Sequence, residues 1–363
     1  MHFVLYTHSL RSDWNHGNAH FLRGVLRALQ ARGHTTLALE PERGWSRDNL
    51  LADQGDAALK RFDQDFPELA VKSYGDGFDH AAALESADVV IVHEWTDPVL
   101  VARLGVLRRQ GGIRALLFHD THHRGVSAAG AIESLALDHY DAVLAFGESL
   151  RARYVQAGWG RRVFTWHEAA DTSLFRPLAG EPPVRDLIWI GNWGDGERAR
   201  ELETFLIEPA RRLGLRGTVH GVRYPAAARA LLDDSPLDYA GWIANAAAPV
   251  AFARHRMTVH VPRRPYVESL PGIPTIRMFE ALACGIPLVS APWDDCEGLF
   301  RAGLDYLRAG DADEMTASLR LLRDDPAYAA ELACSGLATI RGRHSCTHRA
   351  GELLDILAAC GLP

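Results

Sequence analysis

A chain of 363 residues is longer than most single domains, and its 47% apolar residues are enough for two separate cores. Its net charge of −7, from 46 acidic and 39 basic residues without long runs of either sign, argues against binding to nucleic acid or to an anionic membrane surface. The five cysteines are odd in number and include no CxxC pair, which argues against a disulfide framework and a zinc knuckle. No apolar stretch reaches membrane-spanning length, and we expect an unprocessed, cytoplasmic protein without a transmembrane segment.

The first half of the chain alternates short β-rich apolar runs with segments of helical period, which is typical of a parallel sheet covered on both faces. The expected strands are 2–7, 35–39, 88–93, 113–118, 141–145 and 163–166. Residues 18–32 form the clearest helix, because their leucines, valine and phenylalanine share one face. The Pro/Gly-rich stretch at 176–184 indicates a linker, so we assign residues 1–178 to a first Rossmann-like domain.

A second alternation follows the linker and predicts a second Rossmann-like domain over residues 185–342. The expected strands are 186–190, 217–220, 237–240, 257–261 and 286–290, with a shorter candidate at 305–307; the expected helices are 196–213, 226–232, 246–254 and 275–283. The remaining chain is helical by period, and residues 343–363 form a C-terminal helix. The sequence therefore predicts an α/β protein of two doubly wound domains, whose ligands bind beyond the carboxyl ends of the strands.

Three segments carry recognisable motifs: AADTSLFRP at 169–177, WIGNWGD at 189–195 and PTIRMFEALACGIPLVS at 274–290. The first is similar to the domain joint of retaining family 4 glycosyltransferases, and the third resembles the donor-binding helix and following strand of related enzymes. Together they resemble the GT-B glycosyltransferases, specifically the glycosyltransferase-1-like group that includes the CgeB-like spore-maturation proteins. The resemblance implies two Rossmann-like domains that face an interdomain cleft, with the C-terminal helix packed back on the N-terminal domain.

The same resemblance implies a hexosyltransferase that takes a nucleoside-diphosphate sugar as its donor and needs no metal or other cofactor. The acceptor class, whether glycan, small molecule, lipid or protein, stays open. Family 4 enzymes carry a second glutamate eight positions before the one at the site of Glu280, and here that position is Gly272. This departure agrees with the CgeB-like group and leaves the stereochemical outcome open. Two alternatives share the architecture: a nucleotide-sugar 2-epimerase, and a sugar-nucleotide-binding protein without turnover.

The donor side is expected in the second domain. A helix that starts near Pro274 presents unpaired N–H groups to a diphosphate, and Glu280 inside this helix is placed to accept both ribose hydroxyls. The turn after residue 190 and the arginine at 263 are further phosphate candidates, although an ordinary turn and a solvated surface arginine are the alternatives. Expected donor-binding residues are Gly191, Asn192, Trp193, Trp242, Ile243, Arg263, Pro274, Thr275, Arg277 and Glu280.

The acceptor side is expected in the first domain, where polar residues follow strands. His119, Asp120 and His122 are the expected catalytic residues, because an imidazole oriented by a carboxylate can accept a hydroxyl proton near neutral pH; hydrogen bonding within the loop is the alternative. A metal site has the wrong spacing here. Expected acceptor-side residues are Asp13, His16, Gly17, Asn18, Glu94 and Asp97, of which the last is equally well explained as a helix N-cap.

Overall fold

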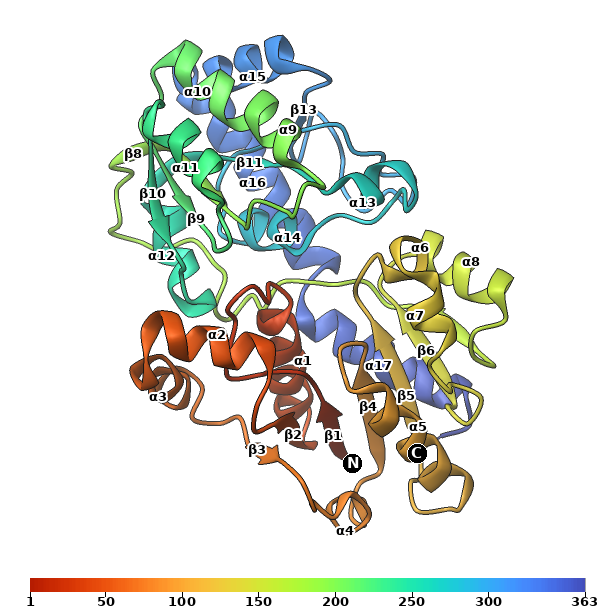
Figure 1. The fold of residues 1–363 in the computed structure, drawn as a ribbon. Helices are drawn as coiled ribbons and strands as arrows, with labels where there is room; N and C mark the ends of the chain where they lie inside the picture. The colour runs from red at the N-terminus through yellow and green to blue at the C-terminus, as the bar shows by residue number, and fades with distance from the viewer. Residues whose placement is uncertain (363) are drawn as a thin grey trace. The chain divides into compact units, whose positions relative to one another are not determined.

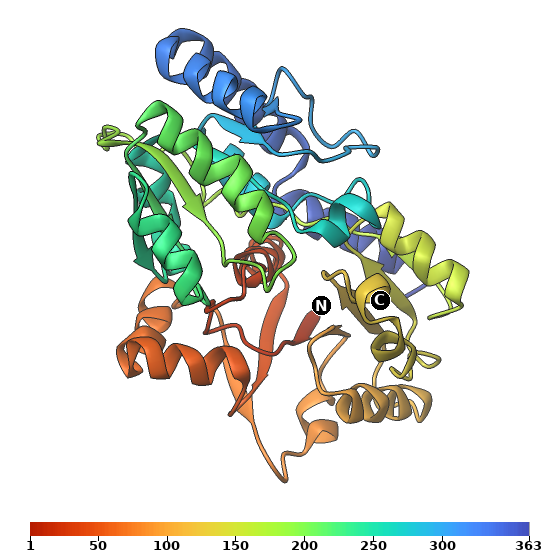
Figure 2. The same cartoon turned by 45° about the horizontal axis from the view of Figure 1, so that its top comes forward.

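The computed structural model describes residues 1–362, which form two compact units. Unit 1 comprises Met1–Glu168 and the C-terminal segment that begins at Cys346, and unit 2 comprises Ala169–Ser345. Each unit contains one parallel sheet with helices on both faces (Figures 1 and 2). The predicted α/β class and the two doubly wound domains are confirmed.

The sheet of unit 1 has seven strands in the order β3-β2-β1-β4-β5-β6-β7. Their bounds are β1 (His2–Tyr6), β2 (Thr35–Pro41), β3 (Val71–Tyr74), β4 (Val89–His93), β5 (Leu116–Asp120), β6 (Ala142–Ala145) and β7 (Val163–Thr165). The chain reverses its direction of strand addition between β1 and β4, which is where open sheets of this type bind ligands. Only β3 was not predicted, because this edge strand is short and only partly buried.

Unit 1 contains nine α-helices among the described residues. They are α1 (Ala19–Ala31), α2 (Trp45–Gln54), α3 (Asp56–Asp65), α4 (His80–Leu84), α5 (Pro98–Arg109), α6 (Arg124–Ser127), α7 (Ala129–Glu133), α8 (Glu148–Ala157) and α17 (Cys346–Ala359). Helix α17 lies beside α1 (Figure 1), and the indole N–H of Trp166 donates to the Arg349 carbonyl at 2.9 Å. The prediction that the C-terminal helix packs back on the N-terminal domain is therefore confirmed.

The sheet of unit 2 has six strands in the order β10-β9-β8-β11-β12-β13. The strands are β8 (Arg185–Ile190), β9 (Gly217–His220), β10 (Leu237–Gly241), β11 (His255–His260), β12 (Leu288–Ser290) and β13 (Leu307–Arg308); the α-helices are α9 (Ala199–Leu202), α10 (Glu208–Leu213), α11 (Ala226–Asp233), α12 (Ala248–Ala253), α13 (Arg264–Glu268), α14 (Ile276–Ala283), α15 (Ala312–Asp324) and α16 (Pro326–Arg343). A π-helical turn, Glu203–Ile207, joins α9 to α10, so the long helix expected at 196–213 is interrupted.

The division between the units lies before Ala169, ten residues earlier than the boundary expected at 178. Residues 169–177 belong to unit 2 because the chain there pairs with the end of that unit: Ala170 N–H donates to the His344 carbonyl at 3.0 Å. Phe175, fully buried, anchors the same segment. The Pro/Gly-rich stretch that marked the boundary in the sequence is thus a loop inside unit 2, since composition alone does not show this long-range pairing.

Candidate functional site

A buried arginine lies under the loop that follows β8. Arg198 is only 7% exposed; its Nη1 donates to the Val261 carbonyl at 3.1 Å, and its Nη2 donates to the backbone and side-chain oxygens of Asn192 at 2.9 and 2.8 Å. Within residues 1–362 no carboxylate forms an ion pair with this guanidinium, and its Nε has no hydrogen-bond partner. Burial, together with the charge of Arg263, lowers the pKa of Arg198 to about 9. A buried cation without a counter-ion is costly, so this position favours an anionic ligand.

The glycines around this arginine make room for it. A Cβ on Gly194, whose φ is +93°, would lie 2.5 Å from Cγ of Arg198, and a Cβ on Gly191 would lie 3.2 Å from its Nη2. The glycine-rich turn therefore encloses a side chain of the protein itself, whereas the sequence suggested that it wraps a phosphate. Trp193, which we expected at the donor site, is instead 7% exposed in the core of unit 2 and packs against Tyr224 with ring centroids 5.5 Å apart. We correct that assignment.

Asn192 links Arg198 to a second arginine. Its side-chain oxygen also accepts from Nη2 of Arg263 at 3.2 Å, and Nη1 of Arg263 donates to Glu197. The side chain of Arg263 is 18% exposed, so it is not a solvated surface residue. Two expected donor residues, Asn192 and Arg263, thus form one connected group with Arg198 and Glu197, and Glu197 neutralises Arg263.

The start of α14 lies next to this group on the sheet edge. Thr275 is the N-cap, yet its side chain does not cap the helix: its hydroxyl contacts Nε2 of His260 at 3.1 Å. Ser290 donates its hydroxyl proton to the Ala291 carbonyl, so its oxygen accepts from Nδ1 of His260 at 2.8 Å, and Nε2 must accept from Thr275. The Thr275 side chain therefore leaves the first turn uncapped; in that turn the Met278 N–H donates to the Thr275 carbonyl at 3.0 Å.

Glu280 is completely buried in α14 and forms an ion pair with Arg277, one turn earlier. Arg277 is 22% exposed, so it covers the carboxylate that we expected to accept the ribose hydroxyls. A ribose can reach Glu280 only if Arg277 moves. Truncating Glu280 to alanine would open a cavity and leave a half-buried cation unpaired, so this change is expected to destabilise the fold.

The loop after β10 holds two further residues expected at the donor site. Trp242 and Ile243 are both half-buried. The indole N–H of Trp242 is buried and has no hydrogen-bond partner among residues 1–362. A buried N–H of this kind costs free energy unless a ligand or water oxygen accepts from it.

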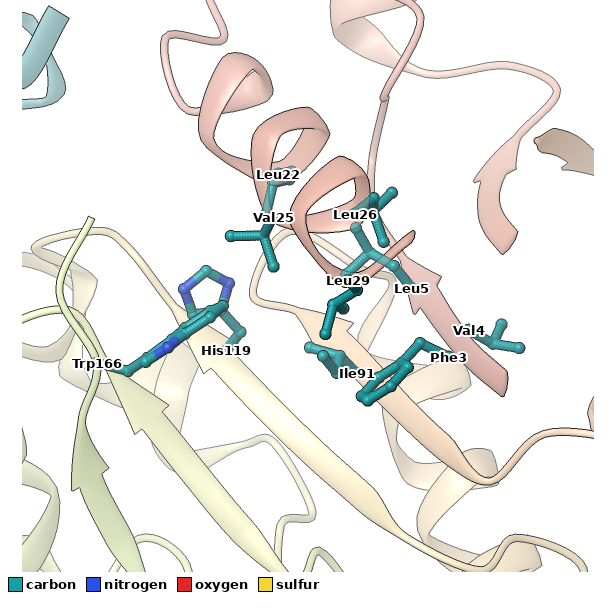
Figure 3. Close-up of a pocket in the computed structure, with 10 residues that line it drawn as sticks. All are labelled: Phe3, Val4, Leu5, Leu22, Val25, Leu26, Leu29, Ile91, His119 and Trp166. Atoms are coloured by element: carbon teal, nitrogen blue, oxygen red, sulfur yellow. The ribbon is translucent and has the colours of Figure 1, made fainter. Parts of the chain in front are cut away.

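In unit 1, the two residues expected to form a catalytic dyad point to opposite faces of the sheet. His119 lies with its ring under α1 in a small apolar pocket, in ring contact with Trp166 at 4.8 Å (Figure 3). Asp120, the next residue on β5, accepts from the Tyr154 hydroxyl on α8 at 2.6 Å. Consecutive residues of a strand alternate between the faces, so this carboxylate cannot orient this imidazole. The expected dyad is therefore corrected.

His119 has the surroundings of a core residue. The pocket is lined by Phe3, Val4, Leu5, Leu22, Val25, Leu26, Leu29, Ile91, His119 and Trp166. Neither ring nitrogen has a hydrogen-bond partner among the described residues, and burial lowers the pKa of His119 to about 3. His122, the third expected catalytic residue, is half-buried at the edge of unit 1, with its ring 5.1 Å from that of Trp95 and 4.0 Å from that of His123.

Two of the expected acceptor-side residues have structural partners. Asp13 accepts from Nη1 of Arg23 at 3.0 Å in an ion pair in which both side chains are buried. Asp97 caps α5, because its Oδ1 accepts from the backbone N–H groups of Val99 and Leu100. Gly17 lies half-buried in the loop before α1. Asp13 therefore stabilises the loop before α1, and Asp97 stabilises the start of α5, as the N-cap alternative predicted.

The other expected residues come together beside Thr121. Its hydroxyl oxygen accepts from Asn18 at 2.7 Å, and its hydroxyl and backbone N–H donate to Oε1 of Glu94 at 2.9 and 3.1 Å. Burial and the neighbouring Asp120 raise the pKa of Glu94 well above its ordinary value. The ring of His16 lies on the same edge of the sheet, 5.9 Å from that of His93.

Sequence reasoning missed two histidines at this edge. The ring of His8 lies 4.0 Å from that of His16 and 5.7 Å from that of His93, between centroids, and the Nε2 of His93 lies 3.3 Å from the Thr121 hydroxyl. Both missed residues stand at or just after the carboxyl end of a predicted strand, so the rule that selected their neighbours also applied to them. His93 is the last residue of an apolar run, so its sequence pattern is that of a core residue.

Among residues 1–362, no group of three histidine, cysteine or acidic side chains is arranged to hold a metal ion. None of the helices in that range is long and apolar enough to cross a membrane.

Comparisons with known proteins place the fold. Residues 198–355 match a family model described as glycosyl transferase-like, and a search of the curated proteins found no match. Sucrose-phosphate synthase from Thermosynechococcus elongatus superposes with a TM-score of 0.67 at 15% identity over 99% of both chains. Anabaena HepE in complex with UDP-glucose gives 0.69 at 12% over 99% and 100%, and an alpha-glucosyltransferase in complex with UDP gives 0.71 at 12% over 99% and 100%. The two parallel-sheet domains of this chain are thus the GT-B fold of these glycosyltransferases.

Proposed function

We propose that this protein is a glycosyltransferase that binds a nucleoside-diphosphate sugar in unit 2 and transfers a hexosyl group to a hydroxyl-bearing acceptor. Buried Arg198, which has no carboxylate partner, is the observation that carries the proposal. With Arg263 and the N-terminus of α14, which has no side-chain cap, it forms a positively charged group suited to a diphosphate. The diphosphate is the leaving group, so the same charges stabilise it as the bond breaks.

UDP-sugars are the donors to test first. Two structural neighbours are complexes with UDP-glucose and with UDP, and both share the GT-B fold with this chain. We further propose membership of the CgeB-like group, related to family 4, on the motif at 274–290 and on Gly272. A cytoplasmic location is supported by the five free cysteines, since unpaired thiols are typical of reducing compartments.

The direct test is calorimetric titration of the wild-type protein with UDP and UDP-glucose, followed by a thermal-shift screen of other nucleoside diphosphates. A ligand at 100 times its dissociation constant is expected to stabilise the native state by about 2.7 kcal/mol. Release of UDP with transfer to a sugar acceptor supports the proposal, whereas conversion of the UDP-sugar to its 2-epimer would establish the epimerase alternative. Absence of binding to every nucleotide in the screen would refute a donor site in unit 2.

Replacing Glu280 with glutamine tests the ribose contact. The amide keeps the volume of the buried side chain but loses the charge that makes strong hydrogen bonds to two hydroxyls, so UDP affinity is expected to fall about tenfold. Calorimetry with UDP and 2′,3′-dideoxy-UDP in both proteins isolates the effect: wild type prefers the ribose form, and Glu280→Gln loses most of that preference. A folded variant that keeps the full preference would show that the hydroxyls bind elsewhere.

Metal independence is a separate prediction. The proposed diphosphate site uses arginines and helix N–H groups for its positive charge, so we expect release of UDP from UDP-glucose to continue at the same rate after exhaustive chelation with EDTA. The measurement is the initial rate before and after dialysis against the chelator. A loss of activity that only Mg²⁺ or Mn²⁺ restores would contradict it.

A further inference from the structure

Arg277 and Glu280 lie one turn apart on α14 and form an ion pair. Nη1 of Arg277 donates to Oε2 of Glu280, and within residues 1–362 this carboxylate is the one hydrogen-bonded partner of the Arg277 side chain. The carboxylate is completely buried, whereas the side chain of Arg277 is 22% exposed. Arg277 is therefore the outer member of the pair, the one that a ligand reaches first.

The place of Arg277 in the helix is unfavourable for a cation. Arg277 is the second residue of α14, and the first turn of this fully described helix contains no acidic side chain. A helix dipole is positive at its N-terminal end, so it destabilises a cation there and stabilises an anion. An ion pair in which the cation precedes the carboxylate along the helix is also weaker than the reverse order. An anion bound at this end of α14 would therefore compete with Glu280 for Arg277.

Arg277 also acts on the buried cation of the proposed diphosphate site. Burial, the charge of Arg263 and the charge of Arg277 together lower the pKa of Arg198 to about 9. Three guanidinium groups thus share one region of unit 2, where Glu197 pairs with Arg263 and Glu280 pairs with Arg277. A diphosphate that neutralises Arg198 also comes within the electrostatic range of Arg277.

Neither half of a nucleotide alone can replace both members of this pair. If Arg277 turns to a free diphosphate, Glu280 is left as a buried carboxylate without a counter-ion, which is strongly destabilising. If ribose hydroxyls bind Glu280, they supply its hydrogen bonds but leave Arg277 without an anion. A nucleoside diphosphate supplies the hydroxyls and the anion in one molecule, so its two halves are expected to bind cooperatively.

We propose that Arg277 makes recognition of the ribose conditional on the diphosphate. In the free protein Arg277 covers Glu280; when a nucleoside diphosphate binds, Arg277 turns to the phosphates and uncovers Glu280 for the two ribose hydroxyls. Arg277 is thus a specificity-determining residue, through which unit 2 selects a nucleoside diphosphate over a nucleoside or a free diphosphate. This inference rests on the proposed function, which puts the diphosphate and the ribose of the donor in unit 2.

Four probes test the inference on the wild-type protein: uridine, 2′,3′-dideoxyuridine, UDP and 2′,3′-dideoxy-UDP. Calorimetry gives the affinities of the diphosphates, and displacement of UDP gives those of the nucleosides. The ribose preference, which is the ratio of the two affinities in each pair, is expected to be about tenfold for the diphosphates and below about twofold for the nucleosides. Equal preferences in the two pairs would overturn the inference and leave the proposed function standing. A wild type that binds no UDP would refute the proposed function and, with it, this inference.

Replacing Arg277 with methionine removes the cover from Glu280. UDP affinity is expected to fall about tenfold, and the nucleosides should now show the same ribose preference as the diphosphates. Arg212→Met is the matched control: Arg212 also pairs with a glutamate on its own helix, Glu208, but is 42% exposed, so both preferences should stay as in the wild type. A folded Arg277→Met protein whose nucleoside preference stays below about twofold would contradict the inference.

If Arg277→Met does not fold, the double variant Arg277→Met/Glu280→Gln replaces it, because this variant removes both charges of the buried pair. It is expected to show no ribose preference in either pair of probes. A double variant that keeps the wild-type preference for UDP over its dideoxy form would show that the hydroxyls bind elsewhere, and the inference would be wrong.

The movement of Arg277 is observed directly in ¹H–¹⁵N correlation spectra of the arginine Nε–H groups, in which Arg277→Lys identifies the signal. We expect this signal to shift when UDP binds and to keep its position when uridine binds. A signal that saturating UDP leaves in place would show that Arg277 stays on Glu280, and would overturn the inference even if UDP binds tightly.

Discussion

Acidification from pH 7.5 to 5.5 is expected to destabilise the protein by roughly 5 kcal/mol, a large part of the stability of a typical domain. Most of the effect comes from four fully buried histidines, His16, His93, His119 and His260; half-buried His8, whose pKa is lowered by burial to about 4, adds to it in the same direction. Burial lowers the pKa of His119 and of His260 to about 3 and holds those of the other two well below 6.5. Below pH 6.5 these histidines are protonated in the unfolded chain but stay neutral in the folded chain. The free energy of unfolding is therefore higher above pH 6.5 and falls below it, by about 1.4 kcal/mol per histidine over this range.

Urea unfolding at the two pH values measures this loss. Three of the four histidines lie in unit 1, so unit 1 should account for about 4 kcal/mol of it and unfold first in acid. His119→Leu is the control, because it removes one group and should reduce the pH dependence by about 1.4 kcal/mol. The variant should not lose stability at pH 7.5, since leucine removes two unsatisfied nitrogens from an apolar pocket. Equal unfolding free energies at pH 7.5 and 5.5 would contradict the assignment of these imidazoles as neutral.

Replacing Arg198 with methionine is expected to weaken UDP binding by roughly thirtyfold or more, because removing one partner of a buried charge pair costs at least about 2 kcal/mol. The carbonyls of Asn192 and Val261 and the ring of Trp189, 5.1 Å away, stabilise this cation only in part, and a diphosphate supplies the missing negative charge. Methionine fills most of the same space, so the loss reports on the charge and on the anchoring of Asn192. The measurement is calorimetry with UDP.

Arg254→Met provides the matched control in the same unit. Arg254 is 58% exposed and pairs with Glu181 at 3.3 Å on the surface, where an ion pair contributes little. Its replacement should leave UDP affinity within twofold of wild type. If Arg198→Met remains folded, as judged by circular dichroism, and binds UDP as tightly as the control, the anion site is not at Arg198 and the main support for the donor site is lost.

The sequence by itself determined the architecture. Near-continuous apolar runs separated by helical periodicity predicted two parallel sheets, because a strand buried on both faces needs apolar residues on both. Because this periodicity is a local property, two elements were predicted wrongly. Strand β3 has no fully buried residue, and the helix at 196–213 is broken by a π-helical turn that periodicity does not reveal. The segment at 274–290 was correctly predicted as a helix and a following strand.

Only the tertiary structure decided what the polar residues contact. Gly191 and Gly194 have the same sequence signature whether they admit a phosphate or, as here, the side chain of Arg198. His119 and Asp120 are adjacent in sequence but face different helices, while His8 and His93 meet across two strands that are far apart in the chain. Whether a buried charge has a partner depends on all the side chains that surround it in the folded protein. Local sequence determines the periodicity of each helix and strand. The electrostatics of a site depend on long-range packing, which a short motif does not predict.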